Sequence, residues 1–243
     1  NVPTMRMQEV DVTLAKAESE DEEIKWVWEK CCQYAEIGDP SVILLPTHAE
    51  IQNFIRKICT IEETDSPIFL RDRDRYDYEP INDLFHESDV NLRYLGNNFG
   101  ELSDSDNHAL TYIMTYHSAK GLDFKHVFLP HLDSDKRFMQ DPDLDRRLFF
   151  VAMTRSRKNL FLSYSSEDPI HYVANFPQDL LHKINCAGPV EDVNQIKEEF
   201  IENVVEIFES RKGIEGEVIT AIIERVLNDD VMEDGLIAEY QED

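Results

Sequence analysis

The chain has little positive charge, few cysteines and no long hydrophobic run, and each shortage excludes a class of protein. Acidic residues outnumber Lys and Arg by 50 to 24 in 243 residues, which gives a formal net charge of −26. The chain as a whole therefore repels a polyanion. Its longest apolar runs, residues 42–45 and 148–153, are far shorter than the roughly 20 residues of a membrane-spanning helix. We expect a cytoplasmic protein without a membrane segment.

Cysteine and histidine are too sparse to predict a disulfide framework or a metal site. No two of the four cysteines form a C-x-x-C pair, so we expect reduced, packed thiols at Cys31, Cys32, Cys59 and Cys186. We expect isolated imidazoles near a sheet edge, and no zinc ligands, at His117, His126 and His131. The acidic run of residues 21–23 opens a predicted helix, and we expect it to be a solvated face.

The charge is distributed unevenly along the chain. Residues 191–243 hold 17 acids and 4 bases, a net charge of −13. Residues 110–165 hold 9 bases and 6 acids, a net charge of +3. Only this basic island can attract a polyanion, whereas the acidic C-terminal segment can dock a protein partner or pack against the sheet.

Alternating strand and helix patterns predict an α/β domain with a parallel sheet. Capping signals at Ser19 and Thr47 open two predicted helices, and Gly38 closes the first of them. The remaining expected elements are strands at residues 41–45, 68–70, 110–115, 126–129 and 160–164, and a helix at 143–157. Beyond residue 189, acid-rich amphipathic helices follow. We therefore expect two parts, residues 1–189 and a helical extension over 190–243.

The first stretch that could carry chemistry is Thr115-Tyr-His-Ser-Ala-Lys-Gly-Leu-Asp-Phe. It lies at the end of a predicted strand, and open parallel sheets bind ligands beyond the carboxyl ends of their strands. Its hydroxyls, imidazole, amine and carboxylate could contact phosphates and a sugar. The alternative is an ordinary polar turn between a strand and the next element.

The second stretch is Asp145-Arg-Arg-Leu-Phe-Phe-Val-Ala-Met-Thr-Arg-Ser-Arg. On the predicted helix, Arg147, Thr154 and Lys158 share one stripe and Arg155 lies about 80° away. Four apolar residues are expected to face the sheet: Leu144, Leu148, Val151 and Ala152. Arginine stays charged and presents a planar fork that matches phosphate oxygens. The alternative is a solvated cationic face.

Together the two stretches resemble motifs V and VI of the UvrD/Rep-type superfamily 1 DNA helicases. Residues 41–58 resemble the strand–helix unit that begins the second motor domain of that family. The resemblance implies a RecA-like parallel sheet flanked by helices. It also implies a protein that binds ATP with Mg²⁺ between two motor domains and moves 3′ to 5′ on single-stranded DNA.

The resemblance also implies roles for single residues. The catalytic residue is Arg155, which in the family reaches the γ-phosphate of ATP. On the nucleotide side the implied residues are Asp123 near the ribose, Gly121 and Lys120 in the same loop, and Arg75 as a second γ-phosphate arginine, with Arg73 and Arg71 as alternates. On the DNA side they are Thr115, His117, Ser118 and Arg147.

A phosphate-binding G-x-x-x-x-G-K-[ST] loop does not occur in the sequence, which starts at Asn1 rather than Met. We therefore expect the second motor domain alone, inactive by itself, whose partner is the N-terminal motor domain of the same parent chain. The alternative is a degenerate, non-enzymatic helicase-like module for protein contacts. The motor interpretation fails if the Arg155 side chain points into the interior, or is held by a neighbouring carboxylate, remote from the ligand edge of the sheet.

Overall fold

A computed structural model describes residues 10–69, 71–72, 75–76, 78–96, 111–134, 142–177 and 180–187. The chain divides into two units, Asn1–Val190 and Glu191–Asp243, and all described residues belong to the first unit. The predicted acidic extension therefore lies outside the described residues and stays a prediction. Within the described ranges, no helix is long and apolar enough to cross a membrane.

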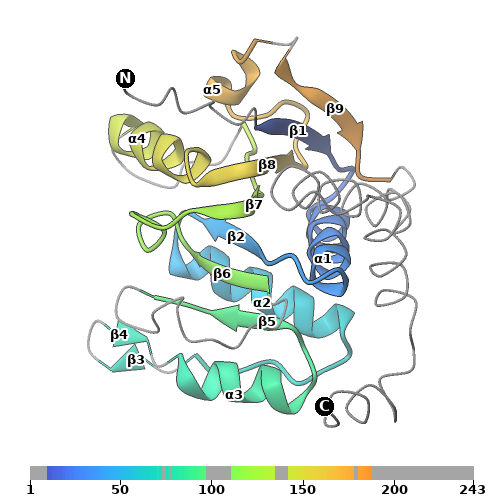
Figure 1. Ribbon diagram of the computed structural model, residues 1–243, viewed down its shortest axis with the longest axis vertical. Coiled ribbons are helices and arrows are strands. Elements are labelled where there is room, and N and C mark those ends of the chain that lie inside the picture. The colour runs from blue at the N-terminus through green and yellow to red at the C-terminus, as the bar shows by residue number, and fades with distance from the viewer. Residues whose placement is uncertain are drawn as a thin grey trace, which may run out of the picture. The chain divides into compact units, whose positions relative to one another are not determined.

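The centre of the domain is a seven-stranded sheet in the order β5-β6-β2-β7-β8-β1-β9, and every neighbouring pair is parallel (Figure 1). Its strands are β1 (Asp11–Lys16), β2 (Ser41–Leu45), β5 (Leu92–Tyr94), β6 (Thr111–Thr115), β7 (Phe124–Leu129), β8 (Ser156–Tyr164) and β9 (His182–Asn185). A separate antiparallel pair consists of β3 (Arg71–Asp72) and β4 (Arg75–Tyr76). The α/β prediction with a parallel sheet is confirmed.

Helices cover both faces of this sheet (Figure 1). They are α1 (Glu20–Glu36), α2 (His48–Ile61), α3 (Glu79–Glu87), α4 (Pro142–Met153) and the short α5 (His171–Ala174). The connection β1–α1–β2 runs one way along the strand order, and β7–α4–β8 runs the other way. Because such crossovers are right-handed, α1 and α4 lie on opposite faces.

Local signals fix the starts of α1 and α2 and the end of α1 as predicted. The Ser19 hydroxyl accepts a hydrogen bond from the Glu22 amide at 3.2 Å, and the Thr47 hydroxyl accepts one from the Glu50 amide at 3.2 Å. These contacts satisfy amides that the first turn of a helix leaves unpaired. Gly38, with φ of +73°, follows α1 in the left-handed region, where glycine carries no steric cost.

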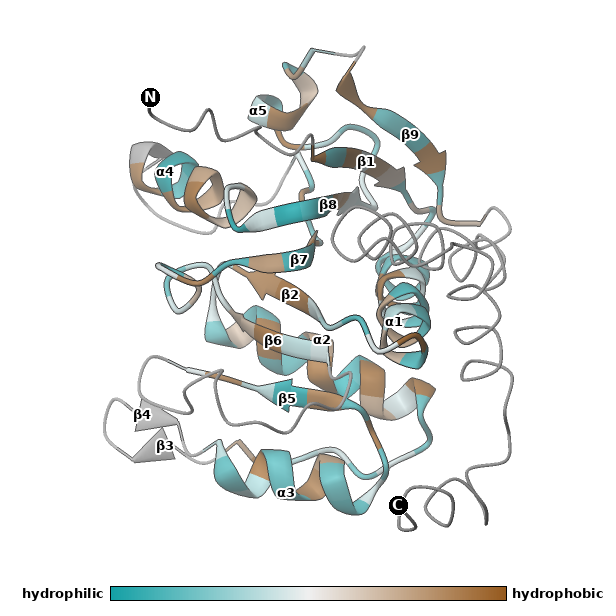
Figure 2. Ribbon diagram, viewed as in Figure 1, coloured by the Kyte–Doolittle hydropathy of each residue, from teal (hydrophilic) through white to brown (hydrophobic). Residues whose placement is uncertain are grey.

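The core lies on both faces of β2, whose five residues are all buried. Val42 and Leu44 belong to the hydrophobic cluster that also contains Phe149 and Ala152 of α4. Because side chains alternate along a strand, Ile43 lies on the other face, the side of α1 and α2. In Figure 2, brown hydrophobic segments follow β2 and alternate with teal polar segments along the helices.

Several predicted elements are wrong or displaced. No strand forms at residues 68–69, where Ile68 is 78% exposed. The helix predicted to run to residue 157 ends at Met153, and β8 begins at Ser156. Lys158 therefore lies in a strand and shares no helical stripe with Arg147. The inward position predicted for Leu144 is also wrong, because that side chain is 40% exposed.

Candidate functional site

The loop of residues 116–123 crosses from one edge of the sheet to the other. Thr115 ends β6 and pairs with Leu45, the last residue of β2. The following strand, β7, starts at Phe124, and its His126 pairs with Ser41, the first residue of β2. The first stretch begins at the end of a strand, as predicted, but it does not stay at the carboxyl edge. Only its beginning lies there, because parallel strands make the loop return to the amino edge.

At the carboxyl edge, Thr115 and Ser118 hold the start of the loop. The two hydroxyl oxygens are 2.8 Å apart, and the Ser118 amide donates to the Thr115 hydroxyl at 3.0 Å. Thr115 is only 6% exposed, whereas His117 and Lys120 are exposed. The structure therefore brings two predicted DNA residues into one hydrogen-bonded turn and leaves His117 and Lys120 facing solvent.

Gly121 lets the chain turn between the start of the loop, at the carboxyl edge, and its end, at the amino edge. Its φ is +89°, in the region that favours glycine, and no atom lies within 4 Å of where a Cβ would stand. The position is exposed. The conformation explains why a glycine stands in this loop, since any other residue there would be strained.

At the amino edge, Arg155 joins the end of α4 to the end of the loop. Its Nε donates to the carbonyl of Val151 at 3.0 Å, and its Nη1 donates to the carbonyl of Leu122 at 3.1 Å. Its Nη2 donates to the Thr154 hydroxyl at 3.2 Å. The two motifs predicted from the sequence are therefore in direct contact through one guanidinium group.

The carboxylate of Asp123 lies between two arginines at this edge. Oδ1 is 3.4 Å from Nη1 of Arg155, and Oδ2 is 2.8 Å from Nη2 of Arg157. The side chains are 38% exposed at Asp123, 20% at Arg155 and 66% at Arg157. Contrary to expectation, Arg155 is therefore paired with a carboxylate, and it lies at the amino edge of the sheet, not at the carboxyl edge where open parallel sheets bind ligands.

Arg157 was not among the predicted site residues, and the helix assignment explains why. Two positions apart on a helix point in different directions, so Arg155 and Arg157 could not share a partner there. In the structure, Arg155 lies in the turn between α4 and β8, and Arg157 is the second residue of β8. From these two positions both arginines reach one carboxylate.

The remaining predicted site residues are Arg147 and the three arginines at positions 71, 73 and 75. Arg147 is exposed on α4. The backbones of Arg71 and Arg75 lie in β3 and β4, but their side chains, and all of Arg73, lie outside the described residues. The role implied for Arg75 and its alternates stays a prediction.

A second carboxylate at the amino edge, Asp39, is paired with two residues of β7. Its Oδ2 is 2.9 Å from Nε2 of the buried His126, and its Oδ1 is 2.6 Å from Nζ of Lys125. Burial raises the pKa of Asp39, but the hydrogen bonds and charges of both partners outweigh burial and lower it. Burial lowers the pKa of His126, whose ring stacks on Tyr34 at 3.8 Å. The Asp39 carboxylate accepts the hydrogen bond from Nε2 of His126, and this contact fixes the start of β7.

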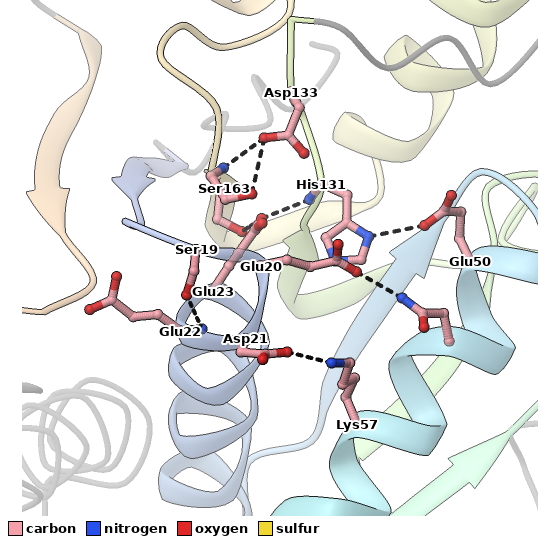
Figure 3. Close-up of polar contacts among 12 residues, drawn as sticks. Ser19, Glu20, Asp21, Glu22, Glu23, Glu50, Lys57, His131, Asp133 and Ser163 are labelled. Carbon is pink, nitrogen blue, oxygen red and sulfur yellow. Dashed lines mark hydrogen bonds and ion pairs between the residues drawn. The ribbon is translucent and has the colours of Figure 1, made fainter.

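A buried carboxylate lies beyond the carboxyl ends of β7 and β8, at Glu23 (Figure 3). Its Oε1 accepts hydrogen bonds from the His131 amide and the Ser163 hydroxyl, each at 2.7 Å. The expectation that residues 21–23 form a solvated face is wrong for this residue, which is 0% exposed. Glu23 therefore fastens the first turn of α1 to two strand ends.

The side chain of His131 joins the same cluster from the loop after β7 (Figure 3). Its Nδ1 is 3.1 Å from a carboxylate oxygen of Glu50, and its φ is +62°. Oε2 of Glu23 and Nε2 of His131 are buried and have no hydrogen-bond partner among the described residues. His126 and His131 thus lie at opposite edges. Across the described residues, no three His, Cys, Asp or Glu side chains form a group that could hold a metal ion.

The stability of the domain should depend on pH through Glu23. Burial raises the pKa of this carboxyl above its ordinary value of 4.5, against the opposing effects of His131 and Ser163. Between the ordinary and the raised pKa, the folded state holds more protons than the unfolded state. The free energy of unfolding therefore falls as pH rises through this window.

The variant Glu23→Gln removes this titration and keeps an oxygen that can accept both hydrogen bonds. We expect the free energy of unfolding of the wild type, minus that of Glu23→Gln, to decrease as pH rises through the window. Urea unfolding of both proteins at several pH values measures this difference. Glu36→Gln, an exposed position on the same helix, is the matched control. A difference that stays constant across pH would contradict the assignment.

Comparisons with known proteins match the region that holds both motifs. Residues 90–167 match the UvrD-like helicase C-terminal domain. A DNA helicase II from Haemophilus influenzae is 30% identical over 108 residues, which cover 37% of this chain and 15% of that protein. An ATP-dependent DNA helicase PcrA from Leuconostoc citreum is 29% identical over 164 residues, which cover 60% of this chain and 20% of that protein.

Among solved structures, the C-terminal domain of a possible DNA helicase from Lactobacillus plantarum WCFS1 is similar, with a TM-score of 0.49 and 12% sequence identity. The similarity covers 71% of this chain and 84% of that one.

The fold and the site define an α/β domain whose two motif-bearing segments meet through an arginine at the amino edge of a parallel sheet. The matched segment contains Thr115, Asp123 and Arg155. The resemblance to the second motor domain of UvrD/Rep-type DNA helicases, predicted from the two motifs, is confirmed by these matches. The chain spans 15% and 20% of the lengths of the two helicases, so it corresponds to a small part of each.

Proposed function

We propose that this chain is the second motor domain of an ATP-dependent DNA helicase that moves 3′ to 5′ on single-stranded DNA. The observation that carries the proposal is the contact between the two motifs, in which Arg155 donates to the carbonyl of Leu122 at 3.1 Å. One side chain thereby joins the turn that carries the arginine to the loop that carries His117. A motor needs such a connection, because its nucleotide and its DNA bind at different places.

ATP fits the amino edge through its terminal phosphate. Arg155 is 20% exposed there, and guanidinium groups bind phosphate oxygens through two parallel hydrogen bonds. When bound, the nucleotide would supply a phosphoryl group whose transfer to water releases free energy. Arg155 would stabilise the charge that develops on that group. In this proposal the first motor domain holds Mg²⁺ and most of the nucleotide.

Single-stranded DNA fits the loop at the carboxyl edge. His117 is exposed there, and so is Lys120, which the resemblance placed on the nucleotide side and which this proposal assigns to DNA. The Thr115–Ser118 hydrogen bonds fix the turn that presents both side chains. This region belongs to the basic island of an otherwise acidic chain. A shift of Arg155 towards a γ-phosphate would pull on Leu122 and Asp123 and so move the loop relative to the DNA backbone.

DNA binding by the chain tests this proposal directly. We expect a fluorescent single-stranded oligonucleotide of thymidines to bind weakly at low salt, and its affinity to fall as salt rises. Lys120→Ala should weaken binding and reduce the salt slope by about one ion, because it removes one phosphate contact. Lys183→Ala, an exposed lysine of β9, is the matched control and should leave binding unchanged. Fluorescence anisotropy measures both quantities.

The competing function is a helicase-like module that contacts proteins and performs no catalysis. The pairing of Arg155 with Asp123 favours it, because this carboxylate already occupies the arginine. Absence of oligonucleotide binding at low salt would support the module and contradict the motor. A protein that joins this chain to a first motor domain, yet shows no DNA-stimulated ATP turnover, would contradict the motor as well.

A further inference from the structure

The carboxylate of Asp123 lies between two guanidinium groups, where a bound anion could also lie. Each of its oxygens contacts a different arginine, Oδ1 with Arg155 at 3.4 Å and Oδ2 with Arg157 at 2.8 Å. Paired arginines bind a phosphate group with the same donors. The carboxylate therefore stands where the oxygen of a bound phosphate could stand.

The two contacts of this carboxylate are unequal. Hydrogen bonds between charged nitrogen and oxygen are ordinarily about 2.7–2.9 Å long. The contact with Arg157 falls within that range, and the contact with Arg155 is longer, at 3.4 Å. Asp123 is thus held mainly by Arg157, and its contact with Arg155 is the easier one to replace.

Arg155 has a donor available for an incoming anion. A guanidinium group has five N–H donors. Four of them point to Val151, Leu122, Asp123 and Thr154. The fifth, on Nη2, has no partner among the described residues. An anion that takes this donor and displaces Asp123 from Nη1 would bind Arg155 through both of its terminal nitrogens.

We propose that Arg155 forms a polyphosphate-binding site which Asp123 occupies in the free protein, and that Arg157 retains Asp123 when a phosphate oxygen displaces it from Arg155. The inference rests on the proposed function and adds a role for two residues. Asp123 acts as a replaceable counter-ion, and Arg157 is a positioning residue that acts through Asp123. A nucleoside diphosphate lacks the γ-phosphate, so it would leave Asp123 in contact with Arg155.

Binding of sodium tripolyphosphate, which carries neither base nor ribose, tests the site in the 243-residue chain. Asp123→Asn removes the competing charge and keeps the shape of the side chain. We expect this variant to bind tripolyphosphate about five-fold more tightly than the wild type, a ratio that corresponds to the free energy of a partly exposed ion pair. Glu167→Gln, an exposed carboxylate beyond the end of β8, removes the same charge at the other edge and should bind like the wild type. Titration calorimetry at low ionic strength measures all three affinities.

Two further variants separate the roles of the arginines. Arg155→Gln, combined with Asp123→Asn, should abolish the five-fold gain. Arg157→Gln should weaken binding more in the wild-type background than in the Asp123→Asn background, because Arg157 acts through Asp123. Equal losses in both backgrounds, or an Asp123→Asn affinity no higher than that of Glu167→Gln, would overturn the proposal. Circular dichroism confirms that each variant is folded.

The outcome is distinguishable from the failure of the proposed function, since tripolyphosphate binding requires neither DNA nor catalysis. A five-fold gain in a protein that never binds DNA would keep the anion site and reject the motor. DNA-stimulated ATP turnover together with unchanged tripolyphosphate binding in Asp123→Asn would keep the motor and reject the role of Asp123.

Discussion

Replacing Arg155 with alanine is expected to lower DNA-stimulated ATP turnover by about 10³- to 10⁵-fold in a protein that joins this chain to a first motor domain. The reason is that the charge on the transferred phosphoryl group would lose its arginine. Steady-state phosphate release in the presence of single-stranded DNA measures the effect. Because Arg155 also donates to Val151 and Leu122, the variant loses local contacts as well as charge.

A second substitution separates these two losses. Arg155→Lys keeps the positive charge but not the planar fork, so it should recover only a small part of the rate. Lys183→Ala, an exposed lysine of β9 outside both motifs, removes the same charge and should retain the wild-type rate. If Arg155→Ala stayed within about ten-fold of the wild-type rate, an arginine finger of the expected size would be excluded.

Replacing Phe128 with alanine is expected to lower the free energy of unfolding by about 3–5 kcal/mol. Phe128 is 0% exposed in β7, and its ring stacks on Phe161 with centroids 4.5 Å apart. The ring of Tyr34 lies 6.4 Å away. The truncation therefore removes buried apolar surface and leaves a cavity between α1 and the sheet.

The matched control for this substitution is Phe150→Ala on α4. Its side chain is 60% exposed, so its loss should change stability by no more than about 0.5 kcal/mol. Urea unfolding monitored by circular dichroism compares the two variants. Similar losses for both phenylalanines would show that the packing described for β7 does not exist in solution.

Elements with strong local signals were predictable from the sequence. The strand β2 is a short apolar run between a glycine-terminated helix and a proline, and it is buried along its whole length. Ser19 and Thr47 cap their helices because a hydroxyl next to free amides needs no distant partner. The two motifs were recognisable for the same reason, since each is a contiguous string of residues.

Elements that depend on a neighbouring strand were missed. β1 ends in a lysine and has no uniform apolar pattern, and it is a strand because it pairs with both β8 and β9. The helix predicted through Arg157 ends at Met153 because β8 pairs with β7 from Ser156 onward. Pairing between strands far apart in sequence outweighs local propensity.

The sequence by itself determined the α/β class, the succession of α1, β2 and α2, and the two motifs, because these depend on residues close together in the chain. Only the tertiary structure decided which edge of the sheet each motif residue occupies, and that Asp123 lies between Arg155 and Arg157. The same is true of Glu23, whose partners His131 and Ser163 are 108 and 140 positions away. Whether a charge is solvated or buried depends on the atoms that folding brings to it, and those atoms lie far along the chain.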